Sequence, residues 1–166
     1  AAWEEALAPL MKRQNPGVTV LRDYHAENIM LLEPEELAGE QGLIDFQDAL
    51  VGHPAYDLVS LLQDARRDVA EDLECEMLGR YRAAADPGAD FEADYARLGA
   101  QRNAKIVGIF TRLWKRDGKA RYLAMIPRVW TAMERDLAHE ALRPVADWFA
   151  ANIPQEMRDT AGGEIQ

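Results

Sequence analysis

Apolar residues recur at two different spacings along the chain, and the first third carries most of the short runs. Near the start, Trp3, Leu7 and Leu10 fall on one helical face, which predicts a helix over residues 2–14. Three short runs of aliphatic and β-branched residues predict strands over 18–21, 29–32 and 43–46. A stretch rich in Glu, Pro and Gly over 33–42 predicts the loop before the last of them.

The spacing becomes helical from Tyr56 onward. The pattern predicts a buried helix over 56–66, helical character continuing to about residue 84, and three further helices: 91–116, 119–136 and 139–152. Strands and helices do not alternate, so we expect an α+β fold that is mainly α, and not a doubly wound sheet. We expect one domain over 1–154 and a polar tail over 155–166.

Composition narrows the class of protein. The chain has 166 residues, 48% of them apolar, which suits one domain with a hydrophobic core. Its formal net charge of −10 argues against nucleic-acid or anionic-membrane partners, because both select a basic surface. Cys75 is the only cysteine, which fits a reducing compartment, and no apolar run is long enough for a membrane span, so we expect a cytoplasmic protein. We also expect a monomer.

Candidate chemistry concentrates between the predicted strands. Arg22-Asp23 is followed five positions later by Asn28, and Asp45 comes seventeen residues after that, within the third run. Two carboxylates and an amide on loops at strand ends suit Mg²⁺, which takes a few oxygen ligands and keeps several waters. Phosphoryl transfer needs such ligands together with one carboxylate that orients the attacking hydroxyl.

These residues carry a family resemblance. Arg22-Asp23 with Asn28, followed by Ile44-Asp45-Phe46, resembles the catalytic loop and metal-binding segment of the protein-kinase-like fold. His25, two residues after the Asp, makes the pattern similar to aminoglycoside phosphotransferases and the choline-kinase-like family.

The resemblance implies a fold and roles for several residues. Asp23 is then the catalytic base, Asn28 and Asp45 bind the metal and the nucleotide, and Asp57 braces the catalytic loop. The cofactors are ATP and Mg²⁺, and the chain is the C-terminal lobe of the fold. The N-terminal nucleotide lobe of the same enzyme lies outside these residues.

A narrower resemblance extends downstream. The stretches 44–49 and 52–65 look like the bacterial anomeric sugar kinases, which phosphorylate N-acetylmuramate and N-acetylglucosamine in peptidoglycan recycling. Two positions depart from the wider kinase pattern. Leu21 stands where kinases of this fold usually carry His, and Gln47 stands where protein kinases carry Gly.

Other polar residues have both a functional and a structural interpretation. His25 is either a general base or a structural support of the loop, and His53 is either a ligand or a satisfied loop histidine. Asp48 is either an acceptor-site carboxylate or a solvated charge. Arg102 falls on the apolar stripe of its predicted helix, and Arg112 lies on the same side. A cation in such a position needs an anionic partner. Either both arginines bind an anionic group of the acceptor, or Arg102 forms an ion pair within the protein.

Three other functions compete with a sugar kinase. An aminoglycoside or choline-like amino-alcohol kinase would keep the same loop and recognise a cationic acceptor. A metal-dependent phosphohydrolase would use Asp23, His25, Asp45 and His53 as ligands, and would leave Asn28 without a role. An inactive interaction domain would have no chemical need for Asp23, Asn28 and Asp45 together.

Overall fold

The computed structural model describes residues 1–12, 17–32 and 41–159. The chain forms two compact units, which are described separately here. The helical unit comprises 1–14, 65–68 and 86–166, and the strand-bearing unit comprises 15–64 and 69–85. Within the described residues, no helix is long and apolar enough to span a bilayer.

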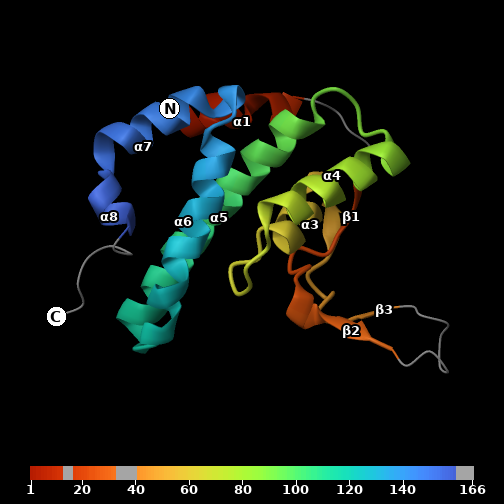
Figure 1. The fold of residues 1–166 in the computed structure, drawn as a ribbon, viewed down its shortest axis with the longest axis horizontal. Coiled ribbons are helices and arrows are strands. Elements are labelled where there is room, and N and C mark those ends of the chain that lie inside the picture. The colour runs from red at the N-terminus through yellow and green to blue at the C-terminus, as the bar shows by residue number, and fades with distance from the viewer. Residues whose placement is uncertain (13–16, 33–40, 160–166) are drawn as a thin grey trace. The chain divides into compact units, whose positions relative to one another are not determined.

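The helical unit is built on an antiparallel pair of helices (Figure 1). The helices α5 (Phe91–Asp117) and α6 (Ile126–Leu137) run side by side, joined by the 3₁₀ segment η2 (Ala120–Met125). The helix α1 (Ala2–Lys12) lies along α7 (Arg143–Asn152), which follows the 3₁₀ segment η3 (Glu140–Leu142). The predicted polar tail begins with a short helix, α8 (Gln155–Asp159).

The core of the helical unit lies between these helices. Ile126, Val129 and Met133 form a fully buried stripe on α6, and Trp130 packs edge-on against Phe149 of α7 with ring centroids 5.6 Å apart. The sequence places these residues at helical spacing, so their burial follows from the period of the pattern. Burying each such side chain contributes about 1.5–3 kcal/mol, which makes this core the main source of stability in the unit.

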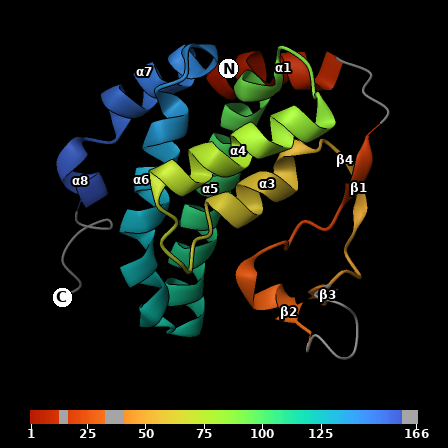
Figure 2. The ribbon, with the colours of Figure 1, turned by 45° about the vertical axis from the view of Figure 1, so that its right-hand side comes forward.

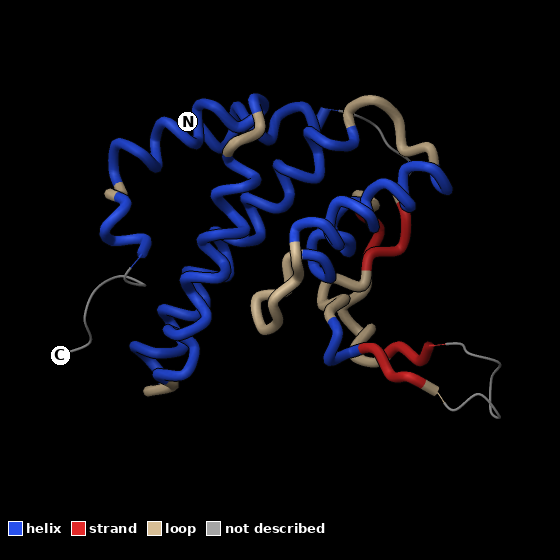
Figure 3. The backbone as a smooth tube through the Cα atoms, in the orientation of Figure 1, coloured by secondary structure: helices blue, strands red, loops and turns tan. Residues whose placement is uncertain are grey.

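The strand-bearing unit holds short strands and two helices (Figure 2). The strand β1 (Val18–Val20) pairs antiparallel with β4 (Leu50–Gly52), and β2 (Ile29–Leu31) pairs antiparallel with β3 (Gln41–Leu43). The helices α3 (Ala55–Leu62) and α4 (Glu71–Ala85) follow. All the described strands lie in this unit (Figure 3). The strands are short and helices make up most of the described chain, so the prediction of a mainly α fold is confirmed.

Several predicted boundaries were wrong. The third strand ends at Leu43 and not at Phe46, and the sequence did not predict β4 at all. The helical pattern was expected to run from 56 to about 84, yet it breaks over 63–70. The predicted loop over 33–42 falls largely outside the described residues.

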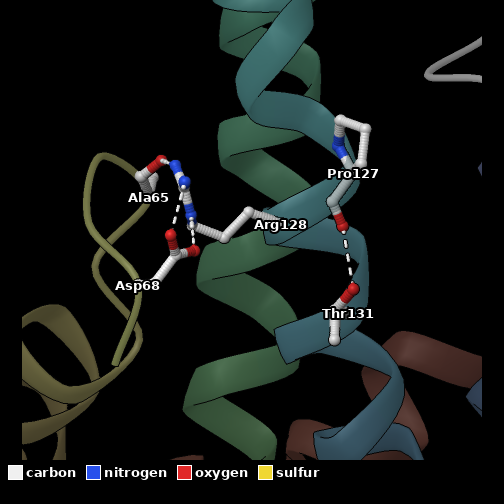
Figure 4. Close-up of polar contacts among 5 residues, drawn as sticks. All are labelled: Ala65, Asp68, Pro127, Arg128 and Thr131. Carbon is white, nitrogen blue, oxygen red and sulfur yellow. Dashed lines mark hydrogen bonds and ion pairs between the residues drawn. The ribbon is translucent and has the colours of Figure 1, made fainter. Parts of the chain in front are cut away.

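A side chain of α6 holds the segment 65–68 (Figure 4). The Arg128 guanidinium donates to both carboxylate oxygens of Asp68, with Nη2 3.1 Å from Oδ2, and its Nη1 donates to the Ala65 carbonyl at 3.3 Å. The hydrogen bonds and charge of Arg128 lower the pKa of Asp68 below its ordinary value. These contacts fall where the apolar spacing predicted a continued helix, and residues 65–68 are not helical.

Gly99 is required where α5 approaches α6. A methyl group at this position would overlap the Asp136 carboxylate, which is 4% exposed and accepts from Asn103 Nδ2 at 3.2 Å. We expect Gly99→Ala to lower the free energy of unfolding by about 1–3 kcal/mol, because the buried carboxylate has to move. Gly108→Ala, in the same helix with open space around it, should raise stability by up to about 1 kcal/mol. Urea unfolding of both variants measures the difference, and equal effects would contradict the contact.

Candidate functional site

Asp23 lies in the segment between β1 and the 3₁₀ turn η1 (Ala26–Asn28), with its side chain exposed. The backbone turns sharply on both sides of it. The Asp23 amide donates to the Leu21 carbonyl at 2.9 Å, and the His25 amide donates to the Asp23 carbonyl at 3.0 Å. These two short turns present the Asp23 carboxylate to solvent instead of to the protein.

Asn28 connects the other two predicted site residues. Its side-chain amide donates to the Asp23 backbone carbonyl at 2.9 Å and lies 3.4 Å from Asp45 Oδ2. The Ile44 amide donates to the Asn28 carbonyl at 3.1 Å, which extends the pairing of β2 with β3 toward Asp45. Asp23, Asn28 and Asp45 therefore come together although Asp45 lies 22 positions after Asp23.

Asp45 is more open than the sequence predicted. Leu-Ile before it and Phe after it suggested a buried strand end, but Asp45 is exposed and lies two residues beyond β3, with a φ of 60°. The neighbouring Ile44 and Phe46 are 46% and 61% exposed. A two-stranded ribbon covers little of either face, which explains the error.

Gln47 contacts Asp45, and the sequence did not reveal this contact. Its side-chain amide donates to Asp45 Oδ1, so the carboxylate is held on one side by Gln47 and lies beside Asn28 on the other. The sequence marked Gln47 only as a departure from the Gly of protein kinases. Its position two residues after Asp45 was the available signal.

Asp57, in the first turn of α3, contacts the backbone before Asp23. Its Oδ2 accepts from the Leu21 amide at 2.7 Å and its Oδ1 accepts from the Arg22 amide at 3.0 Å. Hydrogen bonds to an ionised carboxylate are stronger than neutral ones, and two parallel bonds also fix the orientation of the chain. This is the geometry that bracing of the loop by Asp57 requires, and its catalytic consequence stays a prediction.

The two candidate histidines, His25 and His53, make local contacts. His25 is 6% exposed, and its Nε2 lies 3.4 Å from the Asn28 side-chain amide. His53 precedes α3, and its Nδ1 accepts from the Ala55 amide at 3.2 Å. Both contacts favour the structural interpretation of these residues over direct ligation or general-base chemistry.

The three candidate acceptor-binding residues have different environments. Asp48 is exposed in a turn closed by the Ala49 amide and the Phe46 carbonyl, 3.0 Å apart. Arg102 and Arg112 both lie on α5 of the helical unit, and Arg102 is 7% exposed whereas Arg112 is exposed. The burial of Arg102 favours its structural interpretation, so Asp48 and Arg112 are the more accessible candidates.

Asn28 and Asp45 fit a magnesium ion by their chemistry. Mg²⁺ accepts carboxylate and amide oxygens and keeps several waters, and the exposure of Asp45 leaves room for such waters. Within the described ranges, no group of three or more His, Cys, Asp or Glu residues is arranged to hold a metal. A site formed by Asn28 and Asp45 would supply one amide and one carboxylate, and waters and substrate phosphates would supply the further ligands.

Asp23 and Asn28 come before β2, Asp45 follows β3, and mainly helical segments come after them. The chain belongs to the phosphotransferase enzyme family, whose model matches residues 1–100.

Individual relatives are similar over most of the chain. It is 44% identical over 163 residues to an N-acetylmuramate/N-acetylglucosamine kinase from Caulobacter vibrioides, a match that covers 95% of this chain and 45% of that protein. Kinases of the same name from Neisseria meningitidis and Pseudomonas aeruginosa are 40% and 34% identical, over 80% and 93% of this chain and 41% and 47% of theirs. The chain thus spans less than half the length of these relatives.

Proposed function

We propose that this chain is the catalytic part of an ATP- and Mg²⁺-dependent kinase that phosphorylates a hydroxyl of an amino sugar. The acceptor is N-acetylmuramate or N-acetylglucosamine, as in the names of its relatives, and the anomeric hydroxyl is the site of transfer. The observation that carries the proposal is the Asn28 side chain, which links the Asp23 backbone to the Asp45 carboxylate. Further nucleotide-binding residues belong to a lobe outside this chain.

We assign each residue a role that its position allows. Asp23, exposed directly after the constrained turn at Arg22, orients the sugar hydroxyl and accepts its proton as transfer proceeds. Asn28 and Asp45 would hold Mg²⁺, which when bound neutralises the nucleotide phosphates. Gln47 steadies the Asp45 carboxylate, and Asp57 keeps the backbone before Asp23 in place.

The direct test uses the full-length protein, MgATP and each of the two sugars, followed by ³¹P NMR. The proposal expects an acid-labile sugar 1-phosphate that forms only when sugar and ATP are both present. ATP turnover with an amino alcohol or an aminoglycoside, but with neither sugar, would show that the acceptor was assigned wrongly. The assignment as a phosphotransferase would stand. Release of inorganic phosphate from sugar phosphates without ATP would favour a phosphohydrolase instead.

The metal role of Asp45 can be separated from a general charge effect. We expect Asp45→Asn to raise the Mg²⁺ concentration for half-maximal rate by about tenfold and to lower kcat, because a neutral amide is a weaker ligand. The matched control is Asp48→Asn, another exposed carboxylate three residues away. That variant should leave the Mg²⁺ dependence unchanged, and any effect should fall on KM for the sugar. Identical Mg²⁺ titrations for Asp45→Asn and the wild type would contradict the assignment.

A further inference from the structure

Arg22 lies at the centre of a strained turn directly before Asp23. Its φ is 71°, in the left-handed region that non-glycine residues rarely occupy, and the turn closes through the Asp23 amide and the Leu21 carbonyl, 2.9 Å apart. Three-residue turns with a positive φ at their centre are uncommon and strained. Such a conformation persists only where the surrounding structure holds it.

Two side chains of α3 hold this turn from one side. Asp57 accepts from the Leu21 and Arg22 amides, and the Ser60 hydroxyl donates to the Arg22 carbonyl at 3.3 Å. Asp57 and Ser60 are three residues apart on the helix, so they project from the same face. Ser60 is completely buried, in line with a hydroxyl directed into the protein.

The two side chains act on different peptide groups. Asp57 holds the two peptide groups whose N–H belongs to Leu21 and to Arg22. Ser60 contacts the carbonyl of the next peptide group, the one that joins Arg22 to Asp23. The N–H of that same group donates to the Leu21 carbonyl, so both of its polar atoms are engaged. Rotation of this group would swing the Asp23 side chain, since it sets the backbone direction at Asp23.

We infer that Ser60 is a positioning residue for phosphoryl transfer, acting on Asp23 through the peptide group between Arg22 and Asp23. The inference rests on the proposed function, in which Asp23 orients the acceptor hydroxyl. Small misplacements of a reacting group cost large factors in rate because the reacting atoms must be aligned. The Ser60 bond is long for a hydroxyl donor, so its loss produces a moderate effect on turnover and not the collapse expected for Asp23 itself.

The experiment compares full-length Ser60→Ala, Ser60→Thr and Ser60→Cys with the wild type, using whichever acceptor the wild type phosphorylates. We expect Ser60→Ala to lower kcat about five- to twentyfold, with KM for ATP changed less than twofold and the thermal midpoint nearly unchanged. Ser60→Thr keeps the hydroxyl and should recover kcat to within about threefold of wild type. Ser60→Cys carries a weak donor and should have a kcat between those of the wild type and Ser60→Ala. Because Cys lacks the extra methyl group of Thr, this variant also serves if Ser60→Thr fails to fold.

Thr111→Val is the matched control, since its hydroxyl also donates to a backbone carbonyl, that of Val107 at 2.9 Å, but within α5. Its kcat should remain within about twofold of wild type. A folded Ser60→Ala enzyme with wild-type kcat would overturn the inference and leave the proposed function intact. A loss of kcat in Ser60→Ala that a folded Ser60→Thr enzyme does not restore would also overturn the inference. Absence of phosphoryl transfer by the wild type to any acceptor would overturn the proposed function, and this inference with it.

Discussion

Asp23→Asn should lower kcat by about 10³-fold or more, which corresponds to about 4 kcal/mol of lost transition-state stabilisation. The amide has the shape of the carboxylate but cannot accept the hydroxyl proton. Among the described contacts of Asp23, the hydrogen bonds involve its backbone and not its carboxylate. The substitution should therefore leave the fold, the thermal midpoint and the affinity for ATP close to wild type. Steady-state kinetics with a saturating sugar, together with nucleotide titration, measures the two effects separately.

The matched control for Asp23→Asn is Glu27→Gln, which neutralises another exposed carboxylate in the same loop. It should keep kcat within about threefold of wild type, because Glu27 is exposed and solvent and salt screen the field of an exposed charge. If Asp23→Asn retained more than a tenth of wild-type turnover, Asp23 would not be the group that takes the proton. The reaction would then need a different base.

Long helices were predictable because their signals are local. The sequence predicted a helix over 91–116, and α5 spans Phe91–Asp117. It ends at Gly118, whose φ is 66° and whose amide donates to the Trp114 carbonyl at 2.9 Å, a common helix-terminating arrangement. Asp117-Gly118 carried that signal without any knowledge of the tertiary structure.

Short strands were less predictable because their partners are distant. The strand β4 has three residues, ends in Gly52 and pairs with Val18–Val20 about thirty residues away. The break in the helical pattern after Leu62 has a similar origin. Gln63 Nε2 donates to Glu74 Oε1 at 3.1 Å, and Arg128 holds the segment 65–68. Contacts of this kind override local spacing, and no period in the sequence encodes them.

The candidate site likewise contains residues that the sequence could reveal and residues that it could not. Asp23, Asn28 and Asp45 could be selected from residue type and spacing together with the resemblance of their motif to the protein-kinase-like catalytic loop. Gln47 and Ser60 could not, because their contacts depend on where the backbone places the Asp45 carboxylate and the Arg22 carbonyl. The positive φ of Arg22 is the central case. Nothing in the residue type predicts it, and the bonds that hold it come from a helix more than thirty residues later.

Asp57→Ala should affect stability and turnover together. It removes both acceptors from the Leu21 and Arg22 amides, leaves two partly buried donors without them, and releases the strained turn before Asp23. We expect the free energy of unfolding to fall by about 3 kcal/mol and kcat to fall by about 100-fold. Asp57→Asn, which keeps one carbonyl acceptor, should lie between Ala and wild type on both scales. Urea unfolding and steady-state kinetics of the full-length protein measure the two quantities.

Asp147→Ala is the appropriate control for Asp57→Ala. Asp147 is also a helical aspartate with a partner, Arg143, whose Nε lies 3.2 Å from its Oδ1, but both side chains are largely exposed. An exposed pair of this kind contributes less than about 1 kcal/mol, so the variant should remain close to wild type in stability and kcat. Comparing the two variants separates the effect of losing the Asp57 contacts from the effect of losing an ordinary exposed aspartate contact. If Asp57→Ala resembled Asp147→Ala in both measurements, the backbone before Asp23 would hold its shape without α3, and the strained turn at Arg22 would need another source of support.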